Sequence, residues 1–294
     1  MSRRGWLLFG AMGLIWGVPY LLIKVAVAEV SPAVLVFVRT GLGALLLLPI
    51  VLRRGWLAQL KNRWWPLLAF AALELVGPWL LLSDAERTLS SSMTGLLVAT
   101  APIGGVIVAR FWGDRQPIGV ARLAGLGLGL GGVALLASPG GGVGGVLPVA
   151  EVLLAMVGYA VAPVIAARWL RDVPAMTLTA VCLAVAALAC APWAAASWPA
   201  RMPSGGALLA MAGLAVLCTA VAFVLFFELI NEVGPARATV VAYVNPAVAV
   251  TLGALVLGEA LTLPMGVAFV MILVGSVFAT WKAVAARQPV EVAA

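Results

Sequence analysis

The chain has 294 residues, of which 64% are hydrophobic and only 10% are charged. Soluble domains are about half apolar and a quarter charged, and disordered chains combine low hydrophobicity with high charge. The composition excludes both classes and predicts an all-α integral membrane protein. The net charge of +7 is expected to come from basic cytoplasmic loops, with no nucleic acid as partner.

Ten apolar segments can be drawn in chain order, each long enough to cross a bilayer core of about 30 Å as a helix. They cover residues 6–28, 32–52, 64–82, 89–112, 118–137, 148–170, 174–197, 208–230, 235–257 and 262–285. The breaks at Ser31-Pro32 and Val173-Pro174 are inferred, because a proline disfavours helix in the residue before it. The first segment has features of a signal peptide, but its length and its interruption at 16–19 favour a retained helix.

The sequence repeats itself at an offset of about 144 residues. The matching positions are Ala11-Met12 with Ala155-Met156, Pro19 with Pro163, Pro49 with Pro192, and Pro102 with Pro246. Each half then holds five spans, and because five is odd the second half enters the membrane from the opposite side. We predict a first five-helix repeat at 1–139, a Gly-rich link at 140–147, an inverted second repeat at 148–285 and a tail at 286–294. Inverted repeats are a recurrent plan of secondary transporters, with the binding site between the halves.

The basic residues give an independent test of this topology. If the N-terminus lies in the cytoplasm, nearly all Lys and Arg fall in cytoplasmic loops or at cytoplasmic helix ends. The exceptions are Lys24, Arg39, Arg87 and Arg201. The positive-inside rule therefore predicts that both termini are cytoplasmic.

Several enzyme classes lack the residues that they need. The chain has no histidine, which excludes His-based triads, His metal sites and His proton relays. The Asp residues Asp84, Asp114 and Asp172 lie at predicted helix ends, where an intramembrane aspartyl protease would not place them. No Walker A motif is present, so ATP does not drive the protein directly. We expect no enzyme activity, no metal and no cofactor, and we interpret the three cysteines as packing residues.

Three stretches carry a resemblance to a known family. They are residues 14–24, Ala101-Pro102, and Asn245-Pro246 followed by 257–262. On these residues the chain resembles the EamA-type permeases of the drug/metabolite transporter superfamily, in particular the bacterial aromatic amino acid exporters. The resemblance implies ten helices in two inverted five-helix repeats and export of metabolites across the inner membrane. The first half departs from the family pattern, because 113–116 lacks the usual Glu.

The resemblance places a central cavity among helices one, three, four, six, eight and nine. The substrate-binding candidates are Trp16, Tyr20, Glu74, Trp79, Thr100, Tyr159, Phe223, Phe227, Tyr243 and Asn245. Aromatic walls suit planar ligands and can hold an ammonium by cation–π contact. The alternative for each aromatic is packing against lipid or a neighbouring helix.

Ionisable residues inside spans are functional candidates by default. Glu74 lies in the middle of the third span and Arg39 within the second, and a substrate with both charges needs one site of each sign. Glu74, Arg39 and Glu228 are the candidates for proton coupling, and a structural ion pair is the alternative for Glu74. The paired prolines Pro19, Pro163, Pro102 and Pro246 are predicted hinges, since each frees a backbone carbonyl.

The sequence predicts a secondary transporter that exports amino acids by alternating access. Its partners would be a small-molecule substrate and the lipid bilayer, and it would be a monomer or weak homodimer. Small-residue spacing at Gly125 and Gly129 fits close helix packing within the monomer, with a dimer face as the alternative. The functional alternatives are export of nucleobases, drugs or other metabolites, or a channel or membrane sensor.

Overall fold

The computed structural model describes residues 1–55, 57, 60–112, 119–138 and 145–285. Every regular element within these residues is a helix, and ten helical spans are long and apolar enough to cross a membrane. The spans are Arg3–Val27, Pro32–Arg53, Trp64–Ala85, Ser91–Phe111, Val120–Ala137, Val146–Trp169, Ala175–Ala196, Gly205–Val233, Thr239–Leu257 and Leu263–Thr280. The predicted all-α membrane fold is therefore confirmed, whereas the expected tail and most of the Gly-rich link lie outside the described residues.

Five spans are single helices and five are interrupted. The single helices are α3 (Pro32–Arg53), α8 (Val120–Ala137), α9 (Val146–Trp169), α10 (Ala175–Ala196) and α15 (Leu263–Ala285). The interrupted spans are α1 (Arg3–Gly17) with α2 (Pro19–Val27); α4 (Trp64–Ala71), η2 (Ala72–Val76) and α5 (Gly77–Ala85); α6 (Ser91–Val98) with α7 (Ala101–Phe111); α11 (Gly205–Ala215), η3 (Val216–Val221) and α12 (Ala222–Val233); and α13 (Pro235–Ala238), η4 (Thr239–Tyr243) and α14 (Asn245–Leu257). The interruptions fall in the first, third, fourth, eighth and ninth spans.

Local capping explains where several helices begin. The Ser31 side chain accepts a hydrogen bond from the Val34 amide, and Pro32 occupies the first turn of α3. The Ser90 side chain likewise accepts from the Met93 amide at the start of α6. Serine N-caps and first-turn prolines are favoured helix starts, so the predicted break at Ser31-Pro32 is present.

The helices pack in the order that two related halves require. α3 packs on α10, α6 on α14 and α8 on α15, so three spans meet their own counterparts. The first span packs on the eighth, through α1 with α12 and α2 with α11, and the third packs on the sixth, through α5 with α9. Exchanging the two halves reproduces the same neighbours, as a pseudo-two-fold axis predicts.

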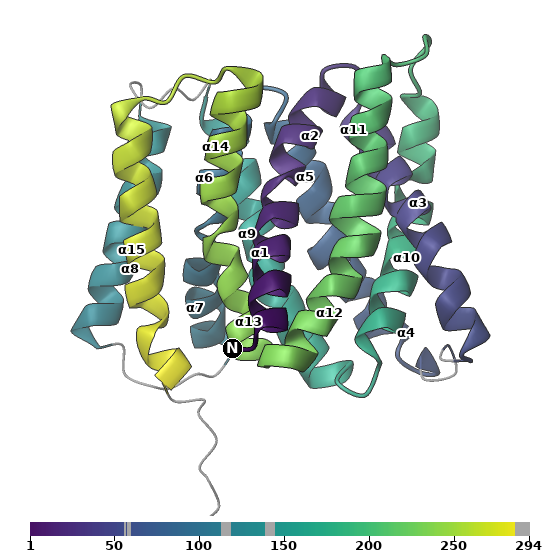
Figure 1. The fold of residues 1–294 in the computed structure, drawn as a ribbon, viewed down its shortest axis with the longest axis horizontal. Coiled ribbons are helices and arrows are strands. Elements are labelled where there is room, and N and C mark those ends of the chain that lie inside the picture. The colour runs from purple at the N-terminus through teal and green to yellow at the C-terminus, as the bar shows by residue number, and fades with distance from the viewer. Residues whose placement is uncertain (56, 58–59, 113–118, 139–144, 286–294) are drawn as a thin grey trace, which may run out of the picture.

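The two ends of the described chain lie on one face of the bundle. Figure 1 shows the start of α1 and the last turn of α15 at its lower edge. We call this side the N-terminal face, and the side where α2 and α5 end the opposite face. A shared face follows from an even number of spans and agrees with the predicted placement of both termini on one side.

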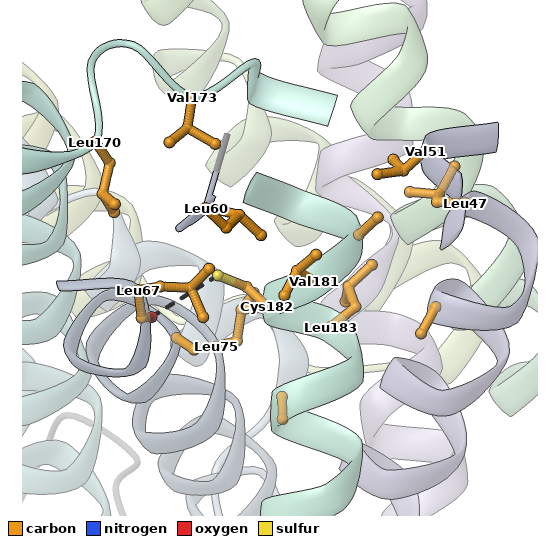
Figure 2. Packing of buried hydrophobic residues seen from close by; sticks show 14 of the residues in the cluster. Leu47, Val51, Leu60, Leu67, Leu75, Leu170, Val173, Val181, Cys182 and Leu183 are labelled. Carbon is orange, nitrogen blue, oxygen red and sulfur yellow. Dashed lines mark hydrogen bonds between the residues drawn. The ribbon is translucent and has the colours of Figure 1, made fainter. Parts of the chain in front are cut away.

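Cys182 and Cys190 are packing residues in the apolar core. Figure 2 shows Cys182 of α10 among leucines and valines of neighbouring helices. Its thiol donates a hydrogen bond to the Leu67 carbonyl, with 3.9 Å between sulfur and oxygen. Cys182, Cys190 and Cys218 are all free and buried.

The glycines of α8 allow it to approach α15 within the monomer. A Cβ atom at Gly125 would lie 2.7 Å from the Gly275 carbonyl oxygen and 2.6 Å from the Ala279 nitrogen. Any larger residue there would force the two backbones apart. The predicted packing use of the small-residue spacing is therefore the one that the structure shows for Gly125.

Candidate functional site

A cavity of about 370 Å³ lies where the interrupted spans of the two halves meet. Its walls come from the first, second, third, fourth, sixth, eighth and ninth spans. The predicted residues that line it are Trp16, Pro19, Tyr20, Arg39, Glu74, Trp79, Pro102, Tyr159, Phe223, Asn245 and Pro246. A volume of this size is typical of small-molecule sites.

The lining residues are related by the internal repeat. The pairs Glu74 with Cys218, Trp79 with Phe223, Leu82 with Phe226, Val98 with Ala242, Ala101 with Asn245, and Pro102 with Pro246 all share the offset of 144, and both members of each pair line the cavity. The third and fourth spans therefore form one wall, and the eighth and ninth spans form the matching wall. The cavity therefore lies between the two halves and is lined by equivalent residues of both.

Both halves carry a π-helical segment at equivalent positions. η2 covers 72–76 and η3 covers 216–221, so the two coincide at the same offset. In the first half Pro78 lacks an amide donor and cannot bond the carbonyl four residues earlier, that of Glu74. In the second half the Thr219 hydroxyl donates to the Leu214 carbonyl at 2.8 Å. π-Helical turns are frequent at functional sites, and here they carry Glu74 and Cys218.

Arg39 is the cationic group of the cavity. It comes from the middle of α3 and is only 8% exposed. Its Nε donates to the Thr219 hydroxyl at 3.0 Å, and its Cζ lies 3.6 Å from the centroid of the Trp79 ring. Among the described residues no carboxylate lies within ion-pair distance of Arg39. The terminal guanidinium nitrogens thus lack a fixed anionic partner.

Glu74 is the anionic group of the cavity. Its side chain lines the cavity, and its buried Oε2 has no hydrogen-bond partner. The structure also shows no ion pair to Glu74 within the parts of the chain that it describes, so the predicted alternative of a structural ion pair is not found there. Buried carboxyl oxygens are normally satisfied, and this one is open to a proton or a cationic ligand.

Aromatic rings form the side of the cavity where the first and eighth spans meet. The Trp16 ring lies 4.6 Å from the Phe226 ring and 6.3 Å from the Phe223 ring, measured between centroids. Phe226 was not among the predicted residues, whereas Phe227 packs behind Phe223 with its centroid 6.1 Å away. The aromatic wall predicted for the eighth span exists, but its register differs by one residue.

Five predicted residues do not line the cavity. The Thr100 hydroxyl donates to the Leu97 carbonyl at 2.6 Å, and the Tyr243 hydroxyl lies 3.1 Å from that of Thr280. Phe227 lies in the second layer, and Pro163 is exposed within an unbroken α9. Glu228 bonds Arg4 at 2.6 Å on the N-terminal face, where its side chain is 46% exposed. The structure thus separates these residues from the candidate site.

Some of the lining residues were not predicted from the sequence. Cys218 and Phe226 could have been found, because they are the repeat equivalents of Glu74 and Leu82. Arg39 was predicted, but the second span was not expected to contribute to the wall. No sequence signal distinguished Ile23, because its neighbours along the first span are apolar as well.

The cavity is closed toward the opposite face. Its lining residues Ile23 and Leu82, near that face, are 3% and 5% exposed, whereas Ala242, near the N-terminal face, is exposed. Beyond the closed end, Lys24 Nζ donates to the Glu86 and Leu89 carbonyls at 2.7 Å each. This contact joins the first span to the end of the third.

Glu259 makes a second link on the opposite face, between α14 and α6. Gly258 ends α14 in the left-handed region at φ +67°, which favours glycine. The turn directs Glu259 to the start of α6, where its carboxylate accepts from the Ser91 amide at 2.7 Å and from the Ser92 amide at 2.9 Å. Burial raises the pKa of Glu259, but the hydrogen bonds from Ser92 and Ser91 outweigh it, and the net pKa is lowered.

Glu259→Ala is expected to destabilise the folded protein by about 0.5–2 kcal/mol, the usual range for losing side-chain hydrogen bonds to the first amides of a helix. Heating followed by size-exclusion chromatography would show a lower midpoint, and Asp172→Asn, at an exposed side chain, is the control. Because the pKa of Glu259 is lowered on folding, its contribution is present above the ordinary carboxyl pKa and is lost as the pH falls through the folded value. An unchanged midpoint would contradict the link.

Comparison with known proteins identifies relatives over nearly the whole chain. The sequence profile of the EamA-like transporter family matches residues 3–138 and 147–281, once on each side of the predicted link. The uncharacterized inner membrane transporter YedA of Escherichia coli K12 is 31% identical over 264 residues, or 87% of this chain and 84% of that protein. The proteins of the same name from strains O6:H1 and O157:H7 give the same values.

A solved structure supports the fold independently. One crystal structure of a protein matches 98% of this chain and 100% of its own chain with a TM-score of 0.65. Its sequence identity is 23%, so the likeness concerns the fold alone.

Proposed function

The chain belongs to the EamA-like transporter family, and we propose that it exports amino acids, aromatic ones among them, through the cavity between its two halves. The observation that carries the proposal is the presence of one cation, one anion and an aromatic wall around a single cavity. Arg39, Glu74 and Trp16 represent these three chemistries. A zwitterion with an apolar side chain is complementary to all three.

Each part of an amino acid has a partner in the cavity. The Arg39 guanidinium can bind the carboxylate with two parallel hydrogen bonds, a geometry that lysine does not offer. The Glu74 carboxylate can bind the ammonium. Trp16 and Phe223 offer ring faces and edges to an apolar or aromatic side chain. The aromatic exporter branch that the sequence resembles is thus a chemically consistent choice within the family.

Transport would proceed by alternating access of the two halves around this cavity. The buried end of the cavity at Ile23 and Leu82 corresponds to a state that is closed toward the opposite face. The helix breaks before Pro102 and Pro246 occur at equivalent places in both halves and are the proposed hinges. Pro19 marks a further break, and Pro163 lies in a continuous helix.

The proposed location is the bacterial inner membrane with both termini in the cytoplasm. The name of the Escherichia coli relative places that protein in the inner membrane. The excess of Lys and Arg in loops on the N-terminal face favours a cytoplasmic position for this face. Transport from the N-terminal face to the opposite face would then be export.

Flux in proteoliposomes tests the proposed function directly. Purified protein would be reconstituted and assayed with labelled aromatic and aliphatic amino acids. We expect saturable flux that the unlabelled substrate competes for. Absence of flux for every amino acid, in protein shown to be folded, would reject the substrate class, and nucleobases and drugs would be tested next. Flux that never saturates would instead indicate a channel.

Trp16→Ala and Tyr159→Ala are each expected to weaken transport without loss of folded protein. Removing one ring from a ligand-binding wall costs about 1–2 kcal/mol, or roughly 5- to 30-fold in apparent affinity. Competition with unlabelled substrate in proteoliposomes would measure the change. Trp65→Ala is the control, because Trp65 is 80% exposed on the outer surface of the bundle. Wild-type kinetics for both variants would remove these residues from the site.

A further inference from the structure

Glu86 is a buried acid that the proposed substrate site does not use. It follows the last residue of α5 and the third span, and its side chain is 0% exposed. Neither of its carboxyl oxygens has a hydrogen-bond partner. An ionised carboxylate in such a place would be a buried, unpaired charge, which costs several kcal/mol. The geometry therefore requires a ligand for this group, and the smallest is a proton.

No neighbouring cation neutralises Glu86. Lys24 Nζ lies close, but it donates to the backbone carbonyls of Glu86 and Leu89, and no ion pair joins its ammonium to the Glu86 carboxylate within the described chain. On α3, Arg39 is a second positive charge that acts on Glu86, and its guanidinium contacts Thr219 and Trp79. Lys24 and Arg39 therefore act on the Glu86 carboxylate through their charge, without a hydrogen bond to it.

The other groups around Glu86 make its ionisation harder or leave it unaffected. Glu259, which follows α14, faces it with a like charge, and Tyr20 on α2 faces it as a neutral phenol. Asp84 and Arg87, its neighbours in sequence, pair with each other at 3.2 Å. On α9 the nearest acid, Glu151, interacts with Asp84. Among the described groups around Glu86, only Lys24 and Arg39 carry a charge that opposes the burial of its carboxylate.

Glu86 also lies inside the links that close the opposite face. Lys24 donates a hydrogen bond to the backbone carbonyl of Glu86 itself, and Glu259 accepts hydrogen bonds from Ser91 and Ser92 at the start of α6. The Ser91 hydroxyl is a second buried group without a partner in this region. Opening of this face would break the contacts around Glu86 and admit water to its carboxyl group.

We propose that Glu86 is a proton-binding site at the closed opposite face. Glu86 holds a proton while that face is closed and loses the proton when the face opens. This site is separate from Glu74, which faces the cavity. The proposal rests on the proposed function only in assuming that the opposite face opens during transport. It does not depend on which substrate is carried.

The direction of the effect follows from linkage. Burial raises the pKa of Glu86 well above the ordinary carboxyl value, and the positive charge of Lys24 only partly opposes the shift. The closed state thus binds the proton more tightly than the hydrated, open state. Acid on the opposite face favours closure, and opening becomes easier as the pH rises above the ordinary carboxyl pKa. A proton arriving from outside would then return an exporter to its inward-open state.

Cysteine labelling at the sealed end of the cavity tests the proposal without any substrate. Ile23→Cys would be introduced with Cys182, Cys190 and Cys218 changed to Ala, because Ile23 lines the cavity and is 3% exposed. A membrane-impermeant maleimide would be added to right-side-out vesicles over a range of pH. Met202→Cys, at a position 83% exposed on the same face, corrects for the effect of pH on thiol reactivity.

We expect the labelling rate of Ile23→Cys, relative to Met202→Cys, to rise with pH by up to about tenfold per pH unit, the limit for one linked proton. Glu86→Gln should keep this ratio low at every pH, Glu86→Asp should retain the rise, and Asp172→Asn, at an exposed side chain outside the site, should retain it as well. A pH-independent ratio in the parent, or an unchanged rise in Glu86→Gln, would overturn the proposal.

Infrared spectroscopy of the native chain gives a second readout if the cysteine-substituted protein does not fold. A protonated carboxylic acid has a carbonyl-stretch band that an ionised carboxylate lacks. This band should lose intensity in Glu86→Gln at neutral pH, and an unchanged band would overturn the proposal. If the protein shows no amino-acid flux but the expected labelling, the proposed substrate is rejected and the proposed role of Glu86 stands. The reverse outcome would reject Glu86 alone.

Discussion

Arg39→Met is expected to abolish high-affinity export of amino acids while the protein stays folded. Removing one partner of a buried charge contact costs about 2–5 kcal/mol, or roughly 30- to 5,000-fold in apparent affinity. Folding should survive, because no described acid pairs with Arg39 and an apolar side chain of similar volume often replaces a buried ion without loss. Concentration dependence of flux in proteoliposomes would measure the effect.

Two further variants make the Arg39 result specific. Arg39→Lys keeps the charge but cannot make the two parallel hydrogen bonds, so its affinity should fall between wild type and Arg39→Met. Arg53→Met removes an exposed charge from the end of the same helix and should leave flux unchanged. Wild-type affinity in a folded Arg39→Met protein would show that Arg39 supports the Trp79 wall without binding substrate.

Glu74→Gln is expected to uncouple transport from a pH gradient. Glutamine keeps the size of the side chain but cannot bind and release a proton. If one proton is exchanged per substrate, a gradient of one pH unit can drive up to about tenfold accumulation, since it is worth about 1.4 kcal/mol. In Glu74→Gln the accumulation ratio should fall to about one, while exchange of labelled for unlabelled substrate continues at higher substrate concentration, because glutamine accepts a hydrogen bond from the ammonium but carries no charge. Flux with an imposed gradient would measure both quantities.

Glu228→Gln is the matched control for Glu74→Gln. Glu228 was also predicted as a coupling candidate, but the structure places it beside Arg4 on the N-terminal face, half exposed. It should keep gradient-driven accumulation. Gradient-driven transport that survives unaltered in Glu74→Gln would exclude Glu74 as the coupling group. Loss of accumulation in Glu228→Gln would indicate a coupling group on the N-terminal face.

The arrangement of the two acids suggests a division of work in the transport cycle. Glu74 faces the cavity, where substrate and proton would compete, and Glu86 lies behind the closed end of the same cavity. Arg39 is in the electrostatic surroundings of Glu86 and of Tyr159, and Tyr159 in turn faces Glu74. A proton bound first at Glu86 and later at Glu74 would couple closure of the opposite face to release of the proton at the N-terminal face.

Several features of the fold are encoded locally and could be predicted. The ten spans follow from apolar runs, because a bilayer accepts only segments whose backbone groups bond within a helix. The break at Ser31-Pro32 follows from a serine cap and a first-turn proline. The internal repeat, and with it the idea of a cavity between halves, follows from recurring residues such as Pro102 and Pro246.

The composition of the cavity could be predicted only in part. Glu74 and Arg39 stand out because charged residues are rare inside spans. The aromatic residues do not stand out in the same way. In a membrane helix the lipid-facing side is as apolar as the buried side, so hydrophobic periodicity does not tell which face points inward. The sequence therefore predicts Phe227 as a lining residue, whereas the structure places Phe226 at the cavity.

The number of spans, the internal repeat, the family and the few charged residues available for chemistry can all be read from the amino-acid sequence. Which side chains converge depends on tertiary packing, because the π-helical turns η2 and η3 change the helical register where the cavity forms. Tertiary packing also buries Glu86 completely, although this residue lies between two predicted spans in the sequence. Burial depends on helices brought together from both halves, and no local pattern around Glu86 contains that information.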